Sequence, residues 1–379
     1  MATEYSAVVC YPPNPRPDWR VENVKITRSP KENELKVRMI ASGICHTDVF
    51  VSSIPGGIIG TEYPKVLGHE GSGIVEEVGP GVTIAQVGDP VLLSYDYCKN
   101  CDLCKNEQQP YCLNFHPLNV MGDKNAFETS QGEAAEGKFF GQSSFAGMSI
   151  VSATSVVNVK DLVKSHEELK LLAPLGCGLM TGSGTVINAA RAGPGDIVVV
   201  TGVGAVGSGA IMAAKISGCK EIVAVDRVAS RLEIAKEVGA TKVLDTSQPE
   251  NMDLAEDLKK LVDNQRISIV VDTTGVIPVI QGCAQALGKR GKLLQIGVPK
   301  RGSELTLALT DFFGMSKTYE CNFLGDTTGQ IWVPKMLQWW REGKFPIEKI
   351  VKYFPIRDAL QAYHGMDSGA AIKPILVWS

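Results

Sequence analysis

Hydrophobic positions follow two different patterns along the chain. Up to about residue 175, short apolar runs such as Lys36–Ala41 and Gly73–Val78 alternate with polar residues or end at glycine and proline, which predicts a mostly β region with irregular loops. Between about residues 180 and 320, strand-like and helix-like runs alternate, which predicts βαβ units around a parallel sheet. The strand-like runs are Ile197–Thr201, Glu221–Val225, Ser268–Asp272 and Lys292–Ile296, and the helix-like runs are Ala205–Ser217, Ser230–Val238, Asp253–Val262 and Val279–Leu287. A tryptophan-rich helical segment and a strand-like Ile375–Trp378 follow.

Composition and charge exclude several classes of protein. With 44% hydrophobic and 21% charged residues, the chain is not a disordered one, and 379 residues suffice for two domains. A net charge of −3 argues against nucleic-acid and membrane surfaces as partners. The long uncharged run Ile197–Ala214 holds several glycines with Thr201 and Ser208, so a strand, a turn and a helix explain it better than a membrane span. Because Met1–Arg20 has no apolar core of a signal peptide, we expect a cytoplasmic protein.

A glycine fingerprint follows the first strand of the βαβ region. Gly202, Gly204 and Gly207 form G-x-G-x-x-G between a strand-like and a helix-like run, and Asp226 ends the next strand-like run. This is the context of a dinucleotide site, in which the helix N-terminus faces the pyrophosphate. The alternative is a glycine-rich turn without a ligand.

The acid of this fingerprint bears on the choice of cofactor. A carboxylate at Asp226 accepts hydrogen bonds from ribose hydroxyls and repels a 2′-phosphate, which favours NAD over NADP. Arg227 and Arg231 follow closely and can soften that repulsion.

Four of the ten cysteines are crowded into one short segment. Their spacing is C-x2-C-x2-C-x7-C, and they are Cys98, Cys101, Cys104 and Cys112. Four thiolates close a tetrahedral zinc shell, so we expect a structural zinc in this lobe, at about residues 95–115. An iron–sulfur cluster would use the same ligands, but nothing else in the sequence indicates electron transfer.

A second set of possible ligands is dispersed along the chain. Cys45, His69 in Gly-His-Glu-Gly and Cys177 would make a catalytic zinc site with an open fourth position. From the residues alone, ordinary buried cysteines and a structural histidine are the better explanation, because single residues of these types are usually structural.

These motifs occur in the order found in one enzyme family. Over essentially its whole length, the chain resembles the zinc-dependent medium-chain alcohol dehydrogenases. Leu93–Cys98 and Phe139–Phe145 look most like the aryl (benzyl) alcohol dehydrogenase branch. The family motifs are Gly43–Asp48, Gly68–Gly71, the four-cysteine lobe, Cys177–Gly178 and Gly202–Gly207.

The resemblance implies roles for the residues around the dispersed ligands. Thr47 matches the hydroxyl that takes the substrate proton. Asp48 matches the acid that hydrogen-bonds the ligand histidine, and Glu70 an acid that approaches the metal during ligand exchange. The positions that match the catalytic zinc ligands are Cys45, His69 and Cys177.

The resemblance also implies residues that contact cofactor and substrate. Cofactor contacts beyond the fingerprint and Asp226 are implied for His46, Thr181, Val206, Arg227, Arg231, Val298 and Lys373, and a substrate pocket for Phe50, Tyr95, Phe139 and Phe140. His46 and Lys373 stand near the pyrophosphate where the family often has arginine, and they lack its bidentate fork. Phe50 replaces a histidine that ends the proton relay in many members, so we expect the relay to end in solvent.

A two-domain α/β fold is therefore expected. The resemblance implies a GroES-like β-rich catalytic domain from 1–178 and 324–379, and a Rossmann domain from 179–323, with the active site in the cleft between them. It implies the reversible oxidation of a primary alcohol, aromatic or allylic, to an aldehyde, with two Zn²⁺ per chain and NAD. A homodimer or homotetramer is expected.

Three alternatives stay open. The scaffold can serve another carbonyl substrate, through glutathione-linked formaldehyde oxidation or a biosynthetic reduction. It can be a non-enzymatic nucleotide-binding protein, although no zinc ligand is lost. The four-cysteine lobe can be a structural module that binds a partner, although its sequence offers no basic or apolar face.

Overall fold

The chain divides into two compact units. The computed structural model describes residues 3–248, 250 and 253–378. The first unit takes in the chain up to Cys177, then Thr328–Gln338 and the chain from Val351 on, and the second takes in Gly178–Thr327 and Trp339–Ile350. No helix within the described residues is both long enough and apolar enough to cross a membrane. The domain limits expected from the sequence stay a prediction.

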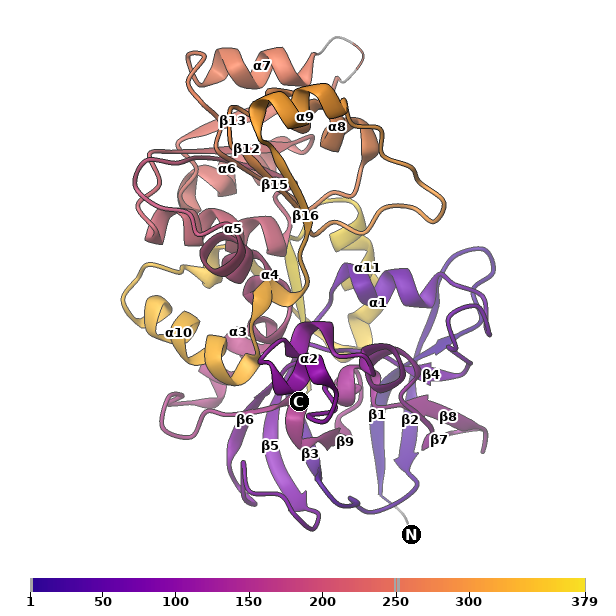
Figure 1. Cartoon of the computed structure of the whole chain (residues 1–379). Helices are drawn as coiled ribbons and strands as arrows, with labels where there is room; N and C mark the ends of the chain where they lie inside the picture. Colours follow the sequence, from indigo (N-terminus) through magenta and orange to yellow (C-terminus); the bar gives the residue numbers. More distant parts are fainter. Residues whose placement is uncertain (1–2, 249, 251–252, 379) are drawn as a thin grey trace. The chain divides into compact units, whose positions relative to one another are not determined.

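The first unit combines a closed barrel with an open sheet (Figure 1). The barrel strands, in order, are β1 (Glu4–Tyr11), β2 (Asp18–Ile26), β7 (Asp123–Thr129), β8 (Ala134–Gly137) and β4 (Lys65–Val66). The open sheet runs β10 (Val156–Asn158), β6 (Pro90–Leu93), β5 (Gly71–Val78), β3 (Glu34–Gly43), β18 (Lys373–Val377) and β17 (Val351–Pro355), with β9 (Met148–Ser152) paired to β3. Alternate side chains of β3, such as Leu35, Val37 and Met39, fill the core of this sheet, as the period of a strand requires.

Short helices connect the strands of the first unit. They are α1 (His46–Ser52), α2 (Asp102–Lys105), α3 (His166–Leu172) and α11 (Ala359–Asp367), and α10 (Gly329–Arg341) begins in this unit. A π-helical turn at Pro117–Met121 and a 3₁₀ turn at Phe139–Gly141 border the region that holds the candidate site. Both turns lie in loops, where a rigid scaffold commonly presents functional residues.

The second unit is a parallel sheet with helices (Figure 1). The strand order is β13 (Lys242–Asp245), β12 (Glu221–Asp226), β11 (Ile197–Thr201), β14 (Ile269–Asp272), β15 (Lys292–Gln295) and β16 (Thr318–Cys321). The helices are α4 (Gly178–Gly184), α5 (Ala205–Ile216), α6 (Ala229–Val238), α7 (Leu254–Leu261), α8 (Ile277–Ala286) and α9 (Leu309–Met315). From β11 the chain adds β12 and β13 on one side of the sheet, and then β14, β15 and β16 on the other side. The switch point therefore lies between β11 and β14, and ligands bind at such a point in a doubly wound sheet.

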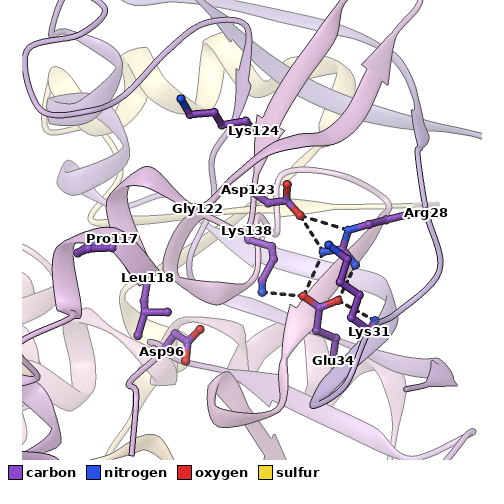
Figure 2. A pocket seen from close by; sticks show the side chains of 10 residues that line it. All are labelled: Arg28, Lys31, Glu34, Asp96, Pro117, Leu118, Gly122, Asp123, Lys124 and Lys138. Carbon is purple, nitrogen blue, oxygen red and sulfur yellow. Dashed lines mark hydrogen bonds and ion pairs between the residues drawn. The ribbon is translucent and has the colours of Figure 1, made fainter. Parts of the chain in front are cut away.

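A charged hollow of about 420 Å³ lies on the surface of the first unit (Figure 2). At its wall, Glu34 accepts hydrogen bonds from Arg28, at 2.5 and 3.0 Å, and from Lys138, at 2.8 Å. Arg28 also donates to Asp123 at 2.7 Å. Burial would raise the pKa of Glu34, but these cations and the backbone N–H of Lys31 lower it from 4.5 to about 2. The network joins β3 to β7 and to the loop that carries Phe139.

We expect Glu34→Gln to lower the free energy of unfolding by about 2 kcal/mol at pH 7, since each unit of pKa shift corresponds to about 1.4 kcal/mol and the charges are partly screened. The folded-state pKa is depressed, so this stability is present above about pH 4.5 and is lost as the pH falls toward 2. Denaturant unfolding of both proteins between pH 7 and pH 2 measures the difference. Glu32→Gln, at an exposed neighbour, is the control. A difference that does not shrink on acidification would contradict this assignment.

Candidate active site

Four residues from three separate segments of the first unit converge on one point. Possible ligand atoms of Cys45, His69, Glu70 and Cys177 all lie within 4.8 Å of one another. Cys45 is the N-cap of α1, and Cys177 follows a 3₁₀ turn at Ala173–Gly176. His69 and Glu70 lie in the connection between β4 and β5. Folding therefore brings Cys45 and His69 together with Cys177, which lies more than 100 residues further along the chain.

The histidine of this cluster is oriented by a buried acid. Asp48 Oδ1 lies 2.9 Å from His69 Nδ1 and accepts the N–H of Gly68 at 3.1 Å, while its Oδ2 accepts the N–H of Cys45 at 2.9 Å. Asp48 and His69 are both fully buried. A carboxylate at Nδ1 holds the proton there, so Nε2 is left as a metal ligand.

The donor set fits zinc. Among the described residues, Nε2 of His69 is a buried nitrogen without a hydrogen-bond partner, and burying such an atom is costly unless a ligand takes it. Two thiols and one imidazole are the ligands of a catalytic zinc that keeps one position open. Lone structural residues, the alternative that the sequence left open, would not bring these atoms together.

The pKa values of the two thiols, Cys45 and Cys177, are shifted in opposite directions. A hydrogen bond from the Cys177 thiol lowers the pKa of Cys45 well below its ordinary value in spite of burial, and His69 adds to this effect. The same hydrogen bond and burial raise the pKa of Cys177 well above its ordinary value. Burial would lower the pKa of His69, but Asp48 and Cys45 raise it. Since thiolates and neutral imidazole are the binding forms, metal uptake releases protons.

Glu70 forms a buried ion pair with Lys373. The ammonium of Lys373 donates to both carboxylate oxygens, at 2.9 and 2.8 Å, and to the carbonyl of Ile44 at 2.9 Å. Burial raises the pKa of Glu70 to about 7, although the charge of Lys373 lowers it. The resemblance implied a position near the pyrophosphate for Lys373. In the structure, its ammonium group contacts Glu70 and the carbonyl of Ile44, the residue directly before Cys45.

Aromatic side chains pack around His69. The ring of Phe140 stacks on it with centroids 4.5 Å apart, and Phe139 meets it edge-on at 5.5 Å. Phe139 is fully buried, so it supports the histidine from within the core. Phe115 was not expected at this site: its ring centroid lies 5.9 Å from that of Phe140 and 6.0 Å from that of Tyr95. In the sequence, only its position after the cysteine lobe indicates it. Tyr95 is also buried, with 2% of its surface exposed.

The helix α1 carries three further residues singled out from the sequence. Thr47 is half-buried, and its Oγ1 lies 3.8 Å from Sγ of Cys45. His46 is exposed at the first position of the helix. Phe50 is 46% exposed and therefore lies on the surface of the helix.

The second cluster of sulfurs lies in the loop around α2. The Sγ atoms of Cys98, Cys101, Cys104 and Cys112 all lie within 4.8 Å of one another. Two of these sulfurs accept hydrogen bonds from the backbone. The N–H of Cys98 donates to Sγ of Cys112 at 3.4 Å, and the N–H of Cys101 donates to Sγ of Cys98 at 3.3 Å. Burial would raise the pKa of Cys98, but hydrogen bonds from Asn114 and the backbone lower it to about 6. Four sulfurs in this geometry suit a closed tetrahedral zinc shell.

The glycine fingerprint of the second unit has the local geometry of a nucleotide-binding turn. Gly202 has φ +83°, which side-chain-bearing residues rarely adopt. A Cβ on Gly207 would lie 1.9 Å from the carbonyl oxygen of Gly202, so only glycine lets α5 approach β11 this closely. Around Gly204, a Cβ would meet no atom within 4 Å, which leaves open space at the helix N-terminus for a phosphate.

The carboxylate of Asp226 closes this turn. Its Oδ2 accepts the N–H of Val203 at 2.7 Å, and its Oδ1 accepts that of Val228 at 2.9 Å. Each oxygen keeps a lone pair for a ribose hydroxyl.

The other residues expected to contact the cofactor differ in exposure. Thr181 is buried, Val206 and Arg231 are half-buried, and Arg227 and Val298 are exposed.

Comparisons with known proteins establish the family. The alcohol dehydrogenase GroES-like domain matches residues 31–161, and the zinc-binding dehydrogenase domain matches residues 205–340. Geraniol dehydrogenase of Castellaniella defragrans is 34% identical, over 94% of each chain. The crystal structure of benzyl alcohol dehydrogenase from Acinetobacter calcoaceticus superposes with a TM-score of 0.89 at 34% identity over all of both chains. An alcohol dehydrogenase zinc-binding domain protein from Burkholderia ambifaria gives 0.92 at 33%, also over all of both chains.

The chain belongs to the zinc-dependent medium-chain alcohol dehydrogenase family, as the resemblance indicated. It is an alcohol dehydrogenase: an oxidoreductase that uses zinc and a nicotinamide cofactor and acts on small-molecule alcohols.

Proposed function

We propose that this enzyme oxidises aromatic or allylic primary alcohols to aldehydes with NAD, and catalyses the reverse reaction. The observation that carries this proposal is the pair of aromatic rings beside the possible metal ligands: Phe140, which stacks on His69, and the half-buried Phe115, which meets Phe140 edge-on. Aromatic and apolar surfaces bind rings and unsaturated chains through their buried area and ring-on-ring contacts. The names of the two 34% identical relatives, geraniol and benzyl alcohol dehydrogenase, support the same substrate class.

In this proposal, Cys45, His69 and Cys177 hold the catalytic zinc. Zinc, when bound, acts as a Lewis acid on the substrate oxygen, and the nicotinamide carries the hydride. Asp48 holds His69 in the ligand tautomer, and the hydroxyl of Thr47 accepts the proton that the alcohol loses and passes it on.

We also propose two zinc ions per chain, the second at Cys98, Cys101, Cys104 and Cys112. These two clusters are the groups of three or more suitable side chains found in the described part of the chain. The four-sulfur site has no open position, so its role is to stabilise the fold.

The further proposals rest on the sequence. They comprise a catalytic domain of residues 1–178 and 324–379, a nucleotide-binding domain of residues 179–323, and a homodimer or homotetramer. Ten free cysteines are compatible with the reducing cytoplasm, where we place the enzyme.

The preference for NAD is assigned to Asp226. We expect Asp226→Ser to lower kcat/KM with NAD by roughly 10- to 100-fold, because a hydrogen bond to a charged group contributes about 1.5–3 kcal/mol. Activity with NADP should fall less or rise, since the repulsion of a 2′-phosphate is removed. Steady-state kinetics with both cofactors measure the ratio, and Asp245→Ser, at the exposed end of the adjacent strand, is the matched control. A wild-type enzyme with higher kcat/KM for NADP would show that Arg227 or Arg231 dominates.

The substrate class is tested by NADH formation across a panel of alcohols. We expect kcat/KM for benzyl alcohol and geraniol to exceed that for ethanol at least about 10-fold, since even one buried methylene gives about that factor. The panel includes S-(hydroxymethyl)glutathione, because the dehydrogenase of that name from Komagataella pastoris is 29% identical over 95% of this chain. Ethanol as the better substrate would reject the aromatic assignment, and turnover of the glutathione adduct alone would replace it.

A further inference from the structure

The segment that carries His69 lies outside the regular strands. β4 ends at Val66 and β5 begins at Gly71, so the intervening backbone needs partners from elsewhere. The loop after Phe139 provides them. The N–H of Ser144 donates to the carbonyl of Gly68 at 2.9 Å, and that of Phe145 to the carbonyl of Leu67 at 3.1 Å.

The side chain of Gln142 continues this pairing to the ligand itself. Its Nε2 donates to the carbonyl of His69 at 2.9 Å, and its Oε1 accepts the N–H of Gly71 at 3.1 Å. One carboxamide thus brackets Glu70 and replaces a neighbouring strand. Gln142 is fully buried, so each of these hydrogen bonds would be costly to lose.

The same carboxamide reaches toward the third ligand. Its Nε2 makes a second donation, to the carbonyl of Ser94 at 2.7 Å. The hydroxyl of Ser94 donates in turn to the carbonyl of Gly176 at 2.7 Å, and Gly176 directly precedes Cys177. Ser94 is 1% exposed. The backbones that carry His69 and Cys177 are therefore joined through two buried polar side chains.

We propose that Gln142 is a positioning residue of the catalytic metal site, which fixes the spacing between the His69 and Cys177 segments through their backbones. This inference rests on the proposed zinc site at Cys45, His69 and Cys177. Loss of a group that orients metal ligands typically weakens metal binding by roughly 10- to 100-fold, because a site that is about 1 Å too loose loses its geometry.

The test replaces Gln142 by methionine, which has a similar length and shape but no polar hydrogen bonds to offer. Gln330→Met is the matched control, because Nε2 of Gln330 also donates to two carbonyls of this unit, those of Thr154 at 2.6 Å and Val156 at 3.0 Å. Zinc content per chain is measured during competition with a chelator. Cobalt is then placed in the Cys45 site, and its visible spectrum reports the ligand geometry.

We expect Gln142→Met to weaken zinc at the Cys45 site by about 10- to 100-fold while the four-cysteine site stays loaded. The cobalt spectrum should change, and Gln330→Met should match the wild type in both measurements. Equal zinc retention and identical cobalt spectra for the two variants would overturn the positioning role, whatever their melting temperatures.

Two further variants keep the test decisive. If Gln142→Met does not fold, Gln142→Glu keeps the length and the acceptor for Gly71 but removes both donations, and it should show the same selective loss. Zinc retention by Gln142→Glu equal to that of the wild type would overturn the proposal. Cys45→Ser separates this inference from the proposed function: if it holds as much zinc as the wild type, the metal site itself is wrong and both fail.

Discussion

Replacing Thr47 by valine is expected to lower kcat by about 100-fold or more, the lower range for a positioned proton-transfer group. The hydroxyl lies 3.8 Å from Sγ of Cys45, beside the possible metal ligands, and it is half-buried. A hydroxyl accepts one proton while it donates another, so it conducts a proton without holding charge, whereas valine keeps the shape and loses this function. Steady-state kinetics at saturating alcohol and cofactor measure the change. Thr47→Ser, which keeps the hydroxyl, should retain most of the activity.

The neighbouring helix positions define where the proton goes next. Phe50 cannot titrate and is 46% exposed, so we expect the relay to end in solvent water. His46→Gln should weaken NAD binding and change kcat little. Thr47 is not part of the proton relay if Thr47→Val keeps most of its activity. His46 is instead the terminal base of the relay if His46→Gln loses kcat at saturating NAD and recovers it with added imidazole.

The second large effect is a contrast between two cysteines. Cys45→Ser is expected to lower turnover by about 1000-fold or more, since a Lewis-acid metal supplies several kcal/mol and each 1.4 kcal/mol is tenfold in rate. Cys104→Ser should instead lower the melting temperature, because a closed zinc shell contributes folding free energy. Turnover, calorimetry and zinc content are measured on both variants.

Cys219→Ser, at a half-buried cysteine of the second unit, is the control and should keep both zinc ions. A Cys45→Ser enzyme with normal turnover, or a Cys104→Ser enzyme with an unchanged melting temperature, would contradict the assignment of catalytic and structural sites.

The central strands of the second unit could be predicted from the sequence because both faces of the sheet are covered. Such strands are continuous apolar runs, and Ile197–Thr201 is β11 with the predicted bounds. The edge strands β13 and β16 were missed, because their residues are half-buried or exposed and carry no comparable signal. In the first unit, the short strands gave the correct class of structure, but the barrel closes through pairings between distant residues that no local pattern encodes.

The candidate site was predicted unevenly for a similar reason. Ligand types and spacing are local, so Cys45 and the four-cysteine lobe are readable as motifs. The role of Gln142 depends on three loops that meet only in the folded chain, although it lies in the segment Phe139–Phe145 that marked the enzyme branch. Phe139 is completely buried and packs edge-on against His69, and its expected place in the substrate pocket stays a prediction.

Anomalous diffraction at the zinc edge, on crystals of the purified enzyme grown without chelator, tests the central claim most directly. We expect two peaks per chain. One should lie within bonding distance of Sγ of Cys45, Sγ of Cys177 and Nε2 of His69, and the other among the four sulfurs of the cysteine lobe. A peak only in the lobe, in crystals of enzyme that oxidises alcohols, would contradict the proposed catalytic site.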